Sequence, residues 1–86
     1  MKIIKRSGSE DVFDVDKIIG AIRKANDSVI DYEKLKDEQI VEIAENVEIA
    51  CENMKRSPSV EEIQDMVENQ LMNQRAFTVA RNYITY

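Results

Sequence analysis

Residues 37–55, DEQIVEIAENVEIACENMK, contain the longest periodic pattern in the chain. Apolar side chains recur there at helical spacing, at Ile40, Ile43, Ala44, Val47, Ala50, Cys51 and Met54. This spacing predicts an amphipathic helix whose apolar face must be covered by other elements. Lys55 and Arg56 are expected in its last turn, where cations suit the helix dipole.

Two further helices are predicted on the C-terminal side of this segment. Ser57-Pro58-Ser59 breaks the chain, and Ser59 with Glu62 forms a capping box that starts a helix running to about residue 73. A last helix is predicted over about 75–86. The side chains expected inward are Ile63, Met66, Val67 and Leu71 in the first of these helices, and Ala76, Phe77, Ala80, Tyr83 and Ile84 in the second.

The N-terminal quarter predicts a hairpin followed by a helix. Strands are expected over residues 2–6 and 11–14, joined by Ser7-Gly8-Ser9, in which Gly8 is free to adopt positive φ. Asp14 is a good N-cap for a helix that ends near residues 26–28, and Phe13 before it can pack on Ile18. Its apolar stripe comprises Ile18, Ile19, Ala21, Ile22 and Ala25. The fold expected for residues 1–86 is one α+β domain, a β-hairpin lid over a small four-helix bundle.

Composition excludes several classes of function. The 86 residues include one cysteine and no histidine, so a disulfide within the chain, a Cys/His metal site and the usual Ser/His or Cys/His nucleophile pairs cannot be built. Neither a phosphate-binding loop of the G-x-x-x-x-G-K-[ST] type nor G-x-G-x-x-G occurs. No apolar run is long enough to span a membrane. We therefore expect a soluble, cytoplasmic domain that is not itself an enzyme.

The charge distribution is uneven. Residues 1–24 hold six basic against four acidic side chains, whereas residues 25–86 hold six against thirteen. An acidic body disfavours nucleic acid, but a locally basic segment can hold a compact anion such as a triphosphate. Lys5, Arg6 and Lys17 are the candidate cations, although neighbours on a strand leave opposite faces unless a twist or bulge re-aims one. An equally weighted alternative is that Lys5 and Arg6 protect an exposed sheet edge.

Four segments together resemble the ATP-cone domain. They are I-x-K-R-x-G from Ile3, F-D-x-x-K-I-x-x-A-I-x-K-A from Phe13, S-V-E-E-I-Q-D-x-V-E from Ser59 and A-R-N-Y-I-x-Y from Ala80. The resemblance covers essentially the whole chain. ATP-cones occur at the N-terminus of many ribonucleotide reductases and in the repressor of their genes, and they act as allosteric switches that distinguish ATP from dATP.

The resemblance implies a nucleotide site and its residues. It assigns Lys5 and Arg6 to the phosphates with Lys17 assisting, Ile3, Phe13 and Ile18 to the walls of the adenine pocket, Asp11 and Asp14 to polar contacts with base or ribose, and Val60 and Gln64 to the sugar and phosphates. Mg²⁺ is expected to accompany the triphosphate. The partners implied are the catalytic domain of the parent reductase and other ATP-cones, with Val41, Ile49 and Tyr86 as candidates for the self-association surface.

Some positions depart from the family pattern. Ser7 replaces an acid or amide in the turn, and Val60 and Gln64 stand where some members carry a hydroxyl and a histidine. A basic residue expected after Y-I-x-Y would lie beyond Tyr86, which suggests reduced affinity and a fragment of a longer reductase. Because Met1 opens directly on the first strand, we expect a reductase rather than the repressor, and the helices look most like the anaerobic, glycyl-radical class. A helical interaction module without a ligand remains the alternative.

Overall fold

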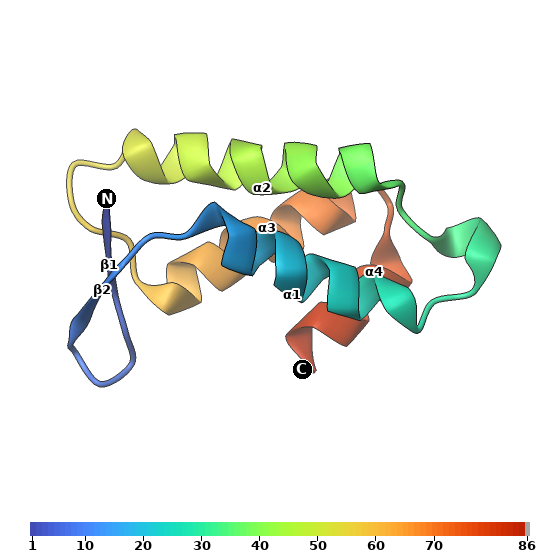
Figure 1. Ribbon diagram of the computed structural model, residues 1–86, viewed down its shortest axis with the longest axis horizontal. Coiled ribbons are helices and arrows are strands. Elements are labelled where there is room, and N and C mark those ends of the chain that lie inside the picture. Colours follow the sequence, from blue (N-terminus) through green and yellow to red (C-terminus); the bar gives the residue numbers. More distant parts are fainter. Residues whose placement is uncertain (86) are drawn as a thin grey trace.

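A computed structural model describes residues 1–85 of the chain. Tyr86, predicted as a candidate for the self-association surface, lies outside that range. The elements in chain order are β1 (Lys2–Ile4), β2 (Glu10–Val12), α1 (Val15–Asp27), the 3₁₀ turn η1 (Asp31–Glu33), α2 (Asp37–Glu52), α3 (Val60–Asn73) and α4 (Phe77–Ile84). Figure 1 shows the hairpin at one end of the helices and η1 at the other. The predicted α+β architecture, a hairpin with four helices, is confirmed.

The helices surround one core. Both α1 and α3 pack against α2 on one side and α4 on the other (Figure 1). The residues that are fully buried between them come from every helix: Ile22, Ile43, Ala44, Val67, Leu71 and Val79. Within residues 1–85, none of the helices combines the length and apolarity needed to cross a bilayer.

The C-terminal end of α2 and the edges of two apolar stripes differ from the prediction. Helix α2 ends at Glu52, so Lys55 and Arg56 lie beyond its last turn. The Arg56 guanidinium instead makes two contacts with the Glu62 carboxylate, at 2.8 and 2.6 Å, which draws this segment toward the start of α3. Ala21 and Ala50 are exposed because each lies at the edge of its stripe rather than at the centre.

Helix α4 is shorter than predicted and is rotated relative to the expected orientation. Arg75 adopts a left-handed conformation with φ 60°, and the Ala76 N–H donates to the Leu71 carbonyl at 2.9 Å, so α3 ends in a Schellman motif. The chain turns there and α4 begins at Phe77. Consequently Phe77 and Ile84, predicted to be buried, are 51% and 56% exposed, while Val79 occupies the core. Met66 and Tyr83 are half-buried.

The hairpin is tight and is anchored to the helices. Gly8 takes φ 86°, and its N–H donates to the Lys5 carbonyl at 2.9 Å, so the turn already begins at Lys5 and the strands are shorter than predicted. Two short strands are marginal alone. The Ile4 N–H donates to the Pro58 carbonyl at 2.9 Å, which ties β1 to the segment before α3. The hairpin therefore lies over the starts of α1 and α3.

A buried asparagine orders the connection between α1 and α2. The Asn26 amide donates to the Leu35 carbonyl at 3.1 Å and accepts the Leu35 N–H at 2.9 Å. The sequence predicted that the helix ends near residues 26–28, but it did not predict the Asn26–Leu35 pair, because the partner lies beyond local turn spacing. With Leu35 held in the core, η1 forms and α2 starts at a defined position.

Candidate functional site

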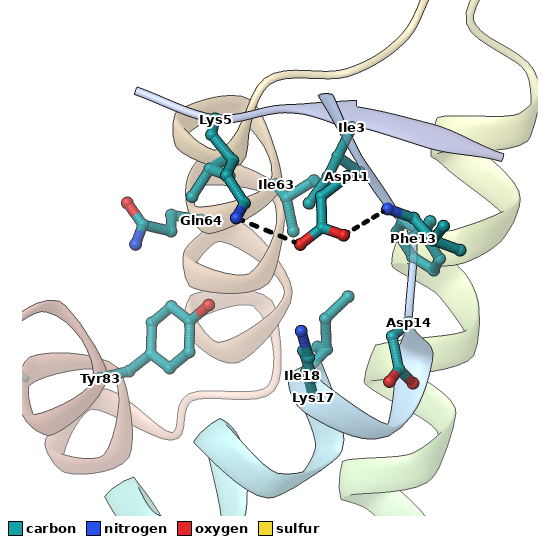
Figure 2. A pocket seen from close by; sticks show the side chains of 12 residues that line it. Ile3, Lys5, Asp11, Phe13, Asp14, Lys17, Ile18, Ile63, Gln64 and Tyr83 are labelled. Carbon is teal, nitrogen blue, oxygen red and sulfur yellow. Dashed lines mark hydrogen bonds and ion pairs between the residues drawn. The ribbon is translucent and has the colours of Figure 1, made fainter. Parts of the chain in front are cut away.

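A cavity of about 290 Å³ lies under the hairpin, close to the lower end of the usual size for ligand sites. Four parts of the fold contribute to it: the hairpin, the start of α1, the start of α3 and the end of α4 (Figure 2). The lining residues are Ile3, Lys5, Asp11, Val12, Phe13, Asp14, Lys17, Ile18, Val60, Ile63, Gln64 and Tyr83.

Helix capping positions two walls of this cavity. The Asp14 carboxylate accepts the Asp16 N–H at 3.0 Å, so α1 begins beside the cavity and carries Lys17 in its first turn. At α3 the Ser59 hydroxyl accepts the Glu62 N–H at 3.1 Å, completing the predicted capping box. The Arg56 guanidinium and the Ser59 backbone N–H hold the pKa of Glu62 down at about 2, so this cap is charged at neutral pH.

The polar side of the cavity carries two lysines and an ionised aspartate. The Lys5 Nζ lies 3.5 Å from Asp11 Oδ2, and Asp11 Oδ1 accepts the Val12 N–H at 2.8 Å (Figure 2). That backbone hydrogen bond, followed by the charge of Lys5, lowers the pKa of Asp11. Lys17 faces the same space from α1. The site thus offers two cations, one of which is paired with the Asp11 carboxylate.

The remaining walls are mostly apolar. Ile3 and Phe13 are half-buried and pack on the core, while Ile18 and Ile63 are nearly covered, at 8% and 7% exposure. A flat, weakly polar group could therefore lie against these side chains while an anionic group faces the lysines. A cavity with one apolar and one cationic side suits an amphipathic anion.

The structure brings together all the predicted site residues except Arg6. The Arg6 side chain is 72% exposed, and its Nε lies 3.7 Å from Glu61 Oε1. It borders a separate hollow, together with Gln64 and Tyr83. Both residues follow the end of β1 at Ile4, and in the hairpin loop their side chains border different hollows. Of the three cations expected to converge, Lys5 and Lys17 do so in this structure.

Sequence reasoning missed three lining residues, Val12, Ile63 and Tyr83. Ile63 was predicted as core, and Val12 carried no signal beyond its strand. Tyr83 was also predicted as core; its place at the cavity depends on the direction of α4, which the left-handed Arg75 determines. Burial raises the pKa of the Tyr83 phenol above its ordinary value.

A dedicated metal site is not evident in the part of the chain that the structure describes, where no three Asp, Glu or Cys side chains are grouped suitably. Residues Asp11 and Asp14 contribute the carboxylates nearest the lysines in the cavity.

The fold and the cavity define a class: a small α+β domain that presents a cation-bearing pocket under a hairpin. Residues 1–86 match the family model described as the ATP cone domain, so the chain belongs to the ATP-cone family. ATP-cones bind ATP or dATP as effectors and are regulatory, non-catalytic parts of ribonucleotide reductases.

Two relatives support this membership. The chain is 37% identical over 95 residues to a vitamin B12-dependent ribonucleoside-diphosphate reductase of Thermoplasma acidophilum, covering 99% of this chain and 11% of that protein. It is 31% identical over 94 residues to a ribonucleoside-diphosphate reductase subunit alpha of Chlamydia trachomatis, covering 100% of this chain and 9% of that protein. The chain thus spans about a tenth of these relatives. Their names do not support the expected anaerobic class.

Proposed function

We propose that this domain binds ATP and dATP in the cavity under the hairpin and regulates the overall activity of a ribonucleotide reductase. The observation that carries the proposal is that one cavity combines apolar side chains, among them Ile3 and Phe13, with two lysines, Lys5 and Lys17. A nucleoside triphosphate offers a matching combination of an aromatic base and anionic phosphates.

In the proposed arrangement the phosphates face Lys5, Lys17 and the start of α1. The free N–H groups of a helix N-terminus favour an anion, and lysine adds a point charge. Mg²⁺ would enter bound to the triphosphate. Arg6 could join the phosphates by leaving Glu61, because an exposed pair at 3.7 Å contributes little.

The base is proposed to lie against Ile3, Phe13 and Ile18. The carboxylates of Asp11 and Asp14 supply acceptors for an amino group or a ribose hydroxyl. Val60 and Gln64 line the cavity from the first turns of α3, where they would approach the sugar. One ribose hydroxyl separates ATP from dATP, and a single hydrogen bond contributes about 0.5–1.5 kcal/mol. That difference is enough to bias a balanced conformational switch.

The parent protein and its assembly are part of the same proposal. We infer a cytoplasmic reductase in which this domain regulates a catalytic domain. For self-association with other cones, Ile49 is 55% exposed and available, whereas Val41 is half-buried. Ile49 is thus the better candidate of the two.

Thermal unfolding with and without nucleotide tests the proposal. Ligand at 100 times its Kd should stabilise the fold by about 2.7 kcal/mol, which raises Tm by several degrees in a domain of this size. Mg-ATP and Mg-dATP should both raise Tm, and Mg²⁺ with inorganic sulfate should not. If millimolar ATP and dATP leave Tm unchanged, the proposal fails and an interaction module without a nucleotide becomes the better description.

A further inference from the structure

We propose that Tyr83 is a nucleotide contact, its hydroxyl donating to a phosphate oxygen and so connecting the ligand to the end of α4. The inference rests on the proposed nucleotide site and adds a fourth element to it. Tyr83 lines the main cavity and also borders the neighbouring hollow that contains Arg6. It therefore stands where phosphates held by Lys5 would lie closest to Arg6.

The orientation of the side chain supports a polar role. In Figure 2 the Tyr83 ring extends from α4 with its hydroxyl turned toward the cavity, on the side of Lys5 and Gln64 and away from Asp14. Within residues 1–85 this hydroxyl makes no hydrogen bond, and burial of the ring is the one cause of its raised pKa. The oxygen itself is reached by solvent, because no buried side-chain oxygen within residues 1–85 lacks a partner, and it is therefore available to a ligand. Here the space in front of the hydroxyl is the cavity.

The position of Tyr83 on α4 gives the contact a consequence beyond affinity. The side of α4 that faces the core is held by Val79 and Ala80, and Asn82 donates to the Ala25 carbonyl at 3.0 Å. Its final turn is closed by the Thr85 N–H, which donates to the Arg81 carbonyl at 3.1 Å. A ligand bonded to Tyr83 would restrain this final turn directly.

The adjacent residue faces a different surface. Ile84 borders a shallow apolar groove with Met72 and Phe77, and all three side chains are about half exposed. Tyr83 and Ile84 are neighbours in one short helix, so restraining one restrains the other. Nucleotide occupancy would thus reach the outer face of α4 without rearranging the core.

Tyr83→Phe tests the contact because it removes the hydroxyl and keeps the ring. Since the hydroxyl has no partner among residues 1–85, the variant should fold with an unchanged Tm. Binding would be measured by calorimetry for ATP, inorganic tripolyphosphate and adenosine. Loss of a hydrogen bond to a charged group should raise the Kd for ATP and for tripolyphosphate about tenfold. The Kd for adenosine should stay within about twofold of the wild-type value. Tyr32→Phe, at an exposed tyrosine in η1, is the matched control.

Hydrogen exchange of the α4 amides gives a second readout that loss of packing would not produce. ATP should slow exchange at residues 81–85 in the wild type and in Tyr32→Phe, but much less in Tyr83→Phe at saturating ATP. Protection at the start of α1 should persist in all three proteins. If Tyr83→Phe binds ATP with the wild-type Kd, or if its affinity for adenosine falls as much as its affinity for ATP, the phosphate contact is refuted. If wild-type protein binds no ATP, the proposed function fails as well, so the two failures are distinguishable.

Discussion

Replacing Lys5 by methionine tests the cationic side of the cavity most sharply. Methionine keeps much of the length of the side chain and removes the charge. The Lys5 Nζ lies 3.5 Å from Asp11 Oδ2, so the substitution also leaves the Asp11 carboxylate unpaired beside the phosphates. Hydrogen bonds between charged groups contribute about 1.5–3 kcal/mol, equivalent to about 10–150-fold in affinity.

The exposure of Lys5 determines where in this range the effect should fall. Its side chain is 50% exposed, so solvent and salt screen the interaction, and the loss should lie near the lower end, about tenfold at physiological ionic strength. Titration calorimetry with Mg-ATP would measure Kd at two salt concentrations. The loss should increase as salt is lowered. A Kd within twofold of wild type in a folded Lys5→Met variant would refute the reasoning.

Lys2→Met provides the matched control for this experiment. Lys2 lies on β1, three residues before Lys5, and pairs with Glu10 at 3.8 Å, but it does not line the cavity. The substitution makes the same change in net charge and should alter the Kd less than twofold. Equal losses in the two variants would mean that net charge, rather than a specific phosphate contact, governs binding.

Three further substitutions test the account of the fold. Asn26→Ala leaves the Leu35 N–H and carbonyl without partners and should destabilise the domain by about 2–4 kcal/mol in urea unfolding; a loss under 1 kcal/mol would contradict the role given to this pair. Arg75→Gly removes the strain of a side chain in the left-handed conformation at φ 60°, and it should stabilise the folded domain by about 0.5–1 kcal/mol. A destabilised variant would show that the contacts of the Arg75 side chain matter more than this backbone strain. Because the pKa of Glu62 falls from 4.5 to about 2 on folding, its stabilisation is present above pH 4.5 and is lost as the pH falls toward 2. Glu62→Gln should therefore be less stable than wild type at neutral pH, and melting curves of the two should converge near pH 2; a constant difference would refute this.

Local signals in the sequence predicted the helices well. The apolar spacing in α2 and the Ser59–Glu62 capping box in α3 involve residues within a few turns of one another, and both elements lie where they were expected. The direction of α4 was not predictable in this way. It depends on a non-glycine residue, Arg75, in a left-handed conformation, which no local rule favours.

The candidate site shows the same division between local and long-range information. Composition and strand alternation indicated a basic hairpin and opposite directions for Lys5 and Arg6, but they could not separate anion binding from edge protection. The family resemblance added residues distant in sequence, such as Val60 and Gln64, and the structure places these beside the hairpin. Neither the residue patterns nor the family resemblance predicted Tyr83 as a site residue, because its position at the cavity depends on the path of α4.

Amide chemical shifts recorded during a titration with Mg-ATP test the central claim most directly. The nucleotide site predicts that the amides of Ile3, Lys5, Phe13, Lys17 and Gln64 shift in a saturable way. Those around the hollow at the opposite end of the domain, near Tyr32, Gln39 and Thr78, should not. Dominant shifts at that opposite end, or no saturable shifts at all, would contradict a nucleotide site under the hairpin.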